Sequence, residues 1–199
     1  MKHATNESEM VVGSHVKSQL STTESSRGAT GPVGRNGAKR NFILQLGFED
    51  PAPAACPLQY SALVFQPKIV LAATVLGILL QSPVVFAGLG ALLWWSALFP
   101  KLNPFNVLYN RTIGGRPGAY RLVPSPAPRR AAETEAGTVA FTSALLIHAG
   151  LSVAAYVVEA VLLAAALTVA LESFCFGAFV YHLLRGRGRF ALQTLPWTR

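Results

Sequence analysis

An acidic residue lies inside one of the most apolar stretches of this sequence. The segment VALESFCFGAFVYHLL, residues 169–184, carries Glu172 among apolar side chains. On a helix, Thr168 and Cys175 share its face because they are spaced at i−4 and i+3. An acid inside a membrane is protonated, paired or directed toward other helices. Glu172 is therefore either a proton- or cation-responsive group in a polar cleft or a protonated acid that joins two helices. We favour the second, because no other acid or lysine accompanies it at that depth.

A second polar pair is expected around the preceding turn. His148 lies near the middle of its apolar run, and Glu159 follows the turn. Pairing the two helices puts the carboxylate about one helical turn from His148, a separation that a bridging water can span. Such a pair would suit proton transfer or a pH response, whereas the simpler interpretation is a histidine that donates one interhelical hydrogen bond. The same pairing makes Thr142 a hydroxyl partner for Glu172.

The cysteines and histidines do not predict a metal site. Cys175 has Glu172 nearby instead of the cation or helix N-terminus that lowers a thiol pKa, so we expect it to pack rather than react. Cys56 lies at the predicted membrane edge and is expected to be more accessible, which permits a reactive or acylated thiol. The chain has two cysteines and four histidines, and they are not spaced as metal ligands usually are. We therefore expect no metal and no cofactor.

The elements that carry these residues have the composition of a membrane protein. Hydrophobic residues make up 51% of the 199 residues and charged residues only 13%, whereas soluble domains contain about a quarter charged residues. No charged residue occurs from Ile69 to Phe99 or from Ala136 to Val158. Apolar runs of about 18 or more residues are typical of membrane spans. We therefore expect an all-α integral membrane protein.

Four transmembrane helices are predicted, arranged as two helical hairpins. The run from Ile69 would be roughly 46 Å long as one helix, well beyond the ~30 Å hydrocarbon core. Gln81, Ser82 and Pro83 interrupt it midway and predict a turn. The second apolar run contains no strong turn signal and is divided only because it is too long for a single membrane span. The predicted spans are about 61–80, 83–99, 136–155 and 157–184, and an irregular cytoplasmic loop at 100–135 joins the hairpins.

The distribution of cations predicts the topology. All 17 Lys and Arg residues lie before Ile69, between Phe99 and Ala136, or after Leu184. Four spans put these three segments on one side, as the positive-inside rule requires. We therefore expect a multi-pass protein of the cell (inner) membrane with both termini cytoplasmic. The side chains expected to contact anionic lipid headgroups are Lys68, Lys101, Arg129, Arg130 and Arg185.

Two terminal segments differ from the membrane domain at 56–184. Residues 1–55 are rich in Ser, Thr, Gly and charge, and we predict a disordered polar arm. Residues 185–199 form a basic cytoplasmic tail. The net charge is +8, but the sequence contains no motif that recognises a nucleic-acid groove. Attraction of the basic residues to anionic lipid headgroups therefore explains the charge better than binding to nucleic acid. The expected partners are the lipid bilayer and other membrane proteins or a second copy of the chain.

Three segments of this domain resemble a known family. They are NPFNVLYN after the second span, PAPRRAAETEAG before the third and ESFCFGAFVY in the fourth. They resemble an uncharacterised bacterial membrane family known only as a domain of unknown function, number four-three-nine-five. That family often has a second cysteine where this chain has Ala178, which argues against a dithiol or metal role. The resemblance covers about Cys56 to Leu184 and implies a multi-span helical protein without an agreed activity.

Three functions remain open. The favoured one is a non-catalytic membrane subunit or interaction (scaffold) protein, rather than an enzyme, because the sequence shows no recognisable catalytic constellation. The second is a small oligomeric transporter or channel that uses Glu172 and His148. The third is a membrane redox or thiol-handling component that uses Cys175 or Cys56, against which the missing second cysteine argues.

Overall fold

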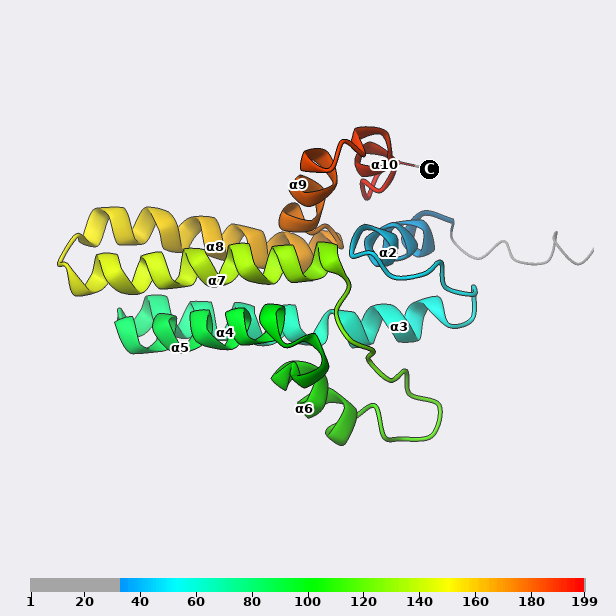
Figure 1. The fold of residues 1–199 in the computed structure, drawn as a ribbon, viewed down its shortest axis with the longest axis horizontal. Helices are drawn as coiled ribbons and strands as arrows, with labels where there is room; N and C mark the ends of the chain where they lie inside the picture. The colour runs from blue at the N-terminus through cyan, green and yellow to red at the C-terminus, as the bar shows by residue number, and fades with distance from the viewer. Residues whose placement is uncertain (1–32, 199) are drawn as a thin grey trace, which may run out of the picture. The chain divides into compact units, whose positions relative to one another are not determined.

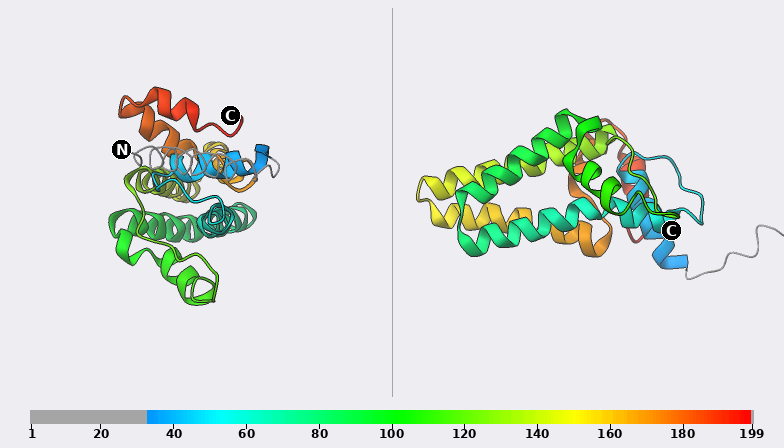
Figure 2. Two further views of the ribbon diagram at one scale, coloured as in Figure 1. Left: turned by 90° about the vertical axis from the view of Figure 1, so that its right-hand side faces the viewer. Right: turned by 90° about the horizontal axis from the view of Figure 1, so that it is seen from below.

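The computed structural model describes residues 33–198, and Gly34–Arg199 form one compact unit. Every regular element in this part of the chain is a helix (Figures 1 and 2), which confirms the all-α fold. The predicted polar arm lies mostly at residues 1–32, outside the described residues.

Four helices form a bundle. Each contacts two others in the closed order α4–α5–α7–α8–α4, and the contact between α5 and α7 is the most extensive. The α4–α5 turn and the α7–α8 turn lie at the same end of the bundle, at the left of Figure 1. An apolar core that includes Phe86, Leu89 and Leu162 fills its interior. The four helices are α4 (Phe65–Leu80), α5 (Pro83–Leu98), α7 (Ala127–His148) and α8 (Ser152–Glu172).

Local sequence explains both turns. Gln81 ends α4 in the left-handed region with a φ of 43°. Ser82 then caps α5 by accepting a hydrogen bond from the Val85 amide at 3.4 Å, and Pro83 occupies the first turn, where its missing N–H costs nothing. The α7–α8 turn contains Gly150, whose φ of 72° favours glycine. The α4–α5 turn lies where the sequence predicts it, whereas the predicted division between 155 and 157 is wrong: the turn lies at residues 149–151, and α8 already begins at Ser152.

Shorter helices surround the opposite end of the bundle. A second apolar core packs α2, α3 and α9 together there. Only Val64 separates α3 from α4, so the two helices are nearly continuous. The shorter helices are α2 (Val33–Gln45), α3 (Cys56–Leu63), the 3-10 helix η1 (Pro100–Leu102), α6 (Pro104–Thr112), α9 (Phe176–Leu184) and α10 (Gly188–Gln193).

The helix α2 corrects the predicted extent of the N-terminal arm. Residues 33–55 were expected to be disordered with the rest of the arm, yet Phe42 and Ile43 are 0% exposed and pack with Leu63 and Ala178. The apolar part of this segment is short, so the polar composition of the whole arm conceals it. Burial against α3 and α9 supplies the apolar contact that α2 lacks by itself.

The predicted loop at 100–135 is also corrected, because it contains α6 and the first turns of α7. The Asn103 side chain caps α6 by accepting hydrogen bonds from the amides of Phe105 at 2.9 Å and Asn106 at 3.2 Å. Pro128 lies in the first turn of α7. Asparagine caps and first-turn prolines start helices, so the turn-forming residues of this segment begin helices rather than continue a loop.

The predicted fourth span at 157–184 is not one helix. Helix α8 ends at Glu172, because Ser173 takes a left-handed φ of 56°. Side chains from distant elements satisfy the polar groups that the break leaves free. Gln45 Oε1 accepts a hydrogen bond from the Cys175 amide at 2.9 Å, and the hydroxyls of Tyr60 and Ser173 lie 2.7 Å apart. The apolar sequence alone carries no trace of these partners.

Candidate functional site

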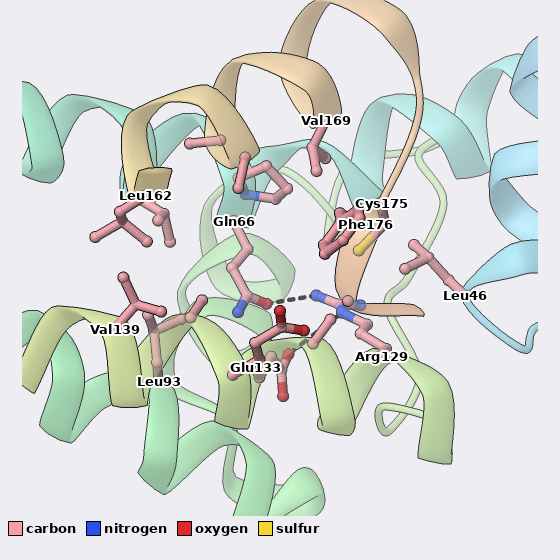
Figure 3. Close-up of a pocket in the computed structure, with 18 of the residues that line it drawn as sticks. Leu46, Gln66, Leu93, Arg129, Glu133, Val139, Leu162, Val169, Cys175 and Phe176 are labelled. Atoms are coloured by element: carbon pink, nitrogen blue, oxygen red, sulfur yellow. Dashed lines mark hydrogen bonds and ion pairs between the residues drawn. The ribbon is translucent and has the colours of Figure 1, made fainter. Parts of the chain in front are cut away.

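A cavity of about 180 Å³ lies between α4, α7, α8 and the start of α9 (Figure 3). Its volume is close to the roughly 150 Å³ of an engineered apolar cavity that binds benzene, so it has room for one small ring. Four polar side chains also line it: Gln66, Arg129 and Glu133, which are buried, and Glu135, which is exposed. The apolar lining includes Leu93, Val139, Leu162, Val169 and Phe176.

The three buried polar side chains form a cluster around an ion pair. Arg129 and Glu133 lie one turn apart on α7, each side chain is 5% exposed, and Arg129 Nε is 3.4 Å from Glu133 Oε1. Arg129 Nη2 donates to Gln66 Oε1 at 2.6 Å and to Asn106 Oδ1 at 3.3 Å. The guanidinium therefore connects α7 to α4 and α6.

Glu133 extends this cluster toward the connection before α7. Its Oε1 accepts hydrogen bonds from Asn103 Nδ2 at 3.3 Å and from Ser125 Oγ at 3.4 Å. Asn103 also caps α6, so one buried side chain serves both the helix start and the carboxylate. We define the polar cluster as Gln66, Asn103, Asn106, Ser125, Arg129 and Glu133.

Two atoms of the cluster are buried without a hydrogen-bond partner in the described part of the chain. They are Arg129 Nη1, a donor, and Glu133 Oε2, an acceptor. The cluster therefore retains one unused donor and one unused acceptor. This is unusual, because buried polar groups are nearly always paired.

The thiol at the cavity is not a nucleophile. Cys175 lines the cavity, and burial raises its pKa to about 11, so the thiol is protonated at neutral pH. Cys56 is the first residue of α3 and is buried as well, which corrects the expectation that it is accessible. The cavity has room for a small molecule, but the Cys175 thiol is buried and protonated and so does not favour thiolate chemistry.

We expect both thiols to react slowly with N-ethylmaleimide at neutral pH while the protein is folded. The physical reason is burial, which hides both sulfur atoms and keeps Cys175 protonated. Mass spectrometry over time should show labelling at least about tenfold slower than in the denatured chain. Rapid modification of either cysteine in folded protein would contradict the burial described here.

The polar site predicted around Glu172 does not form. Glu172 is the last residue of α8 and is exposed, rather than enclosed within a span. Thr168 donates to the Ala165 carbonyl at 2.8 Å, and Thr142 donates to the Thr138 carbonyl at 2.9 Å. Each threonine hydroxyl is thus satisfied by its own helix. The prediction failed because it placed Glu172 inside a longer helix than the one that forms.

The predicted pair of His148 and Glu159 is also not formed. His148 is the last residue of α7 and is exposed at the hairpin turn. Glu159 is buried, and its Oε2 accepts a hydrogen bond from Gln81 Nε2 at 3.1 Å. The partner of Glu159 therefore comes from the other hairpin. Pairing two helices around their shared turn could not reveal this contact.

One of the predicted lipid contacts is corrected. Arg129 is buried in the polar cluster and is not available to headgroups. Arg130 is partly buried and donates from Nε to the Ala97 carbonyl at 2.6 Å, near the end of α5, where cations are favoured. The exposed cations of the predicted set, for which headgroup contact remains a prediction, are Lys68, Lys101 and Arg185.

Sequence reasoning missed most of the polar cluster. The i, i+4 spacing of Arg129 and Glu133 is a recognisable signal for a helical ion pair, and Asn103 before a proline is typical of a helix cap. Nothing in the sequence indicated Gln66 or Asn106, because each enters the cluster through a contact between elements distant in the chain.

The fold is that of an all-helical protein with membrane-length helices. Two stretches, Cys56–Leu80 and Ser152–Glu172, are long and apolar enough to cross a membrane. Residues 61–186 match the family described as Domain of unknown function (DUF4395). The match covers more than half of the chain, so the chain belongs to this family and the resemblance is confirmed. No curated protein and no solved structure matches the chain.

The three segments that carry the resemblance meet at this site. NPFNVLYN contributes Asn103 and Asn106, and PAPRRAAETEAG contributes Arg129 and Glu133. ESFCFGAFVY contributes Cys175 to the cavity wall. The cavity and its polar cluster are therefore built from segments that lie far apart in the sequence.

Proposed function

We propose that this chain is an integral membrane protein that crosses the bilayer four times, through α4, α5, α7 and α8. The observation that carries the proposal is the exposure of large apolar side chains along these helices. Only 22% of the apolar window in Ser152–Glu172 is buried, unlike a core helix. Lipid solvates such a surface, whereas water does not. Side chains that are 69% to 81% exposed include Leu79, Val84, Leu145, Val153 and Leu171.

The charge distribution supports an orientation. The sequence has no Lys or Arg from Ile69 to Phe99 or from Ala131 to Leu184. Exposed cations such as Lys101 and Arg116 therefore flank only the end of the bundle that carries the shorter helices. By the positive-inside rule, this end and both termini are cytoplasmic in a bacterial inner membrane.

Helix length is consistent with this arrangement. Helix α5 has 16 residues, or about 24 Å, which is shorter than the ~30 Å hydrocarbon core. Trp94 and Trp95 near its C-terminal end are exposed and suit the interface. Local thinning of the bilayer accommodates the remaining mismatch.

For the biochemical role we propose a non-catalytic membrane subunit that binds other molecules. The polar cluster joins α4, α6 and α7, and Cys175 is a protonated thiol, which supports binding rather than group transfer. The transporter alternative loses the residues on which it depended. Glu172 and His148 are exposed and end α8 and α7, at opposite ends of the same hairpin.

Cysteine accessibility tests this topology. Ala149→Cys lies in the α7–α8 turn, Arg116→Cys precedes α7 and Arg187→Cys follows α9, and all three positions are exposed. We expect a membrane-impermeant maleimide to label Ala149→Cys from outside intact cells. The other two variants should be labelled only after permeabilisation. The parent chain, with its two buried cysteines, is the background control.

The labelling of Arg116→Cys and Arg187→Cys is decisive. If these variants become labelled from opposite sides of the membrane, an odd number of spans separates them and the proposal fails.

A further inference from the structure

The unpaired atoms of the polar cluster indicate a ligand. Arg129 Nη1 and Glu133 Oε2 are buried without partners, and both residues line the cavity. Neither atom is exposed to the cavity in this arrangement, so a bound molecule would reach them only after the side chain of Arg129 or Glu133 turns toward it. A head group that accepts one hydrogen bond and donates another would satisfy both atoms. A hydroxyl group does both.

The charge of the cluster limits the head group further. Arg129 and Glu133 neutralise each other at 3.4 Å. An anionic ligand such as a carboxylate would leave an uncompensated negative charge beside this pair, and the exposed carboxylate of Glu135 in the cavity lining would repel it as well. An ammonium held by the pair would leave an uncompensated positive charge there. The ligand is therefore expected to be neutral.

The rest of the cavity determines the body of the ligand. Its volume of about 180 Å³ accommodates one ring with a short substituent. Most of its lining is aliphatic or aromatic, and Val161 and Phe176 in that lining are also exposed. The cavity therefore communicates with the apolar side of the bundle. That the ligand enters from lipid rests on the proposed membrane topology.

We propose that this cavity binds a neutral, lipid-soluble molecule that carries a hydroxylated ring of the phenol or hydroquinone class. The ring lies among the apolar side chains of α4, α7 and α8. Its hydroxyl accepts from Arg129 and donates to Glu133. The chemistry is recognition only, and no bond is formed or broken.

Three matched ligands test the proposal on the full chain purified in detergent. para-Propylphenol has the required neutral hydroxyl, para-propylanisole lacks the donor, and para-propylbenzoate is ionised at neutral pH. We expect saturable calorimetric binding of the phenol. The anisole and the benzoate should each bind at least about tenfold more weakly, as loss of a buried hydrogen bond or burial of an uncompensated charge predicts.

Glu133→Gln reverses the expected preference. The substitution keeps the shape of the side chain but leaves the Arg129 charge without its partner, so para-propylbenzoate should now bind more tightly than para-propylphenol. Glu172→Gln removes the same charge at an exposed position outside the cavity lining, and the original order should persist. Circular dichroism and thermal unfolding establish that each variant is folded.

Two results would overturn the proposal. One is equal or absent binding of para-propylphenol and para-propylanisole to the folded parent chain. The other is an unchanged ligand order in folded Glu133→Gln. If that variant does not fold, the ligand series on the parent chain decides the matter alone. Failure of the topology experiment would change the route of entry but not the order of affinities measured in detergent.

Discussion

Arg129→Met is expected to destabilise the folded protein by about 3–5 kcal/mol, the usual cost of removing one partner of a buried ion pair. The substitution leaves Glu133 buried without its cation and removes the donors to Gln66 and Asn106. The free energy of unfolding can be measured by titrating SDS into detergent micelles. Arg130→Met is the matched control, because Arg130 is only partly buried and its hydrogen bond is to one backbone carbonyl. Its cost should be about 1 kcal/mol.

The double variant Arg129→Met/Glu133→Leu separates the charge from the packing. Removing both ions relieves the uncompensated charge, so it should recover most of the stability lost by Arg129→Met. An Arg129→Met chain as stable as the parent would show that the ion pair does not hold these helices together.

Gly90→Ala is expected to cost about 1–3 kcal/mol, whereas Gly88→Ala on the same helix should cost nothing. A Cβ at Gly90 would lie 3.0 Å from the Gly137 carbonyl oxygen and 2.9 Å from the Phe141 ring. It would push α5 away from α7 at the most extensive helix contact of the bundle. A Cβ at Gly88 would meet nothing within 4 Å.

Gly88→Ala should even stabilise the chain by up to about 0.5–1 kcal/mol, because alanine favours helix over glycine. The two substitutions, Gly90→Ala and Gly88→Ala, are thus expected to change the stability of the chain in opposite directions. Thermal unfolding of the two variants in the same detergent provides the comparison. Equal midpoints would mean that α5 and α7 do not approach as closely as described.

The sequence by itself determined the properties that depend on composition and local spacing. The all-α fold follows from long apolar runs without charge, and the turn at Gln81 follows from residues that end one helix and begin the next whatever surrounds them. Membership in the family follows from three short segments. These features need no distant contact, because helix formation and helix ends depend on neighbouring residues.

Only the tertiary structure decided which polar residues form a site. The pair of Arg129 and Glu133 meets Gln66, Asn103 and Asn106 because three separate segments fold onto one another. The same packing buries α2 and ends α8 at Glu172, where hydrogen bonds from distant side chains replace those of a continuous helix. A buried charge is tolerated only where partners converge on it, and that convergence is a property of three-dimensional contacts rather than of sequence spacing.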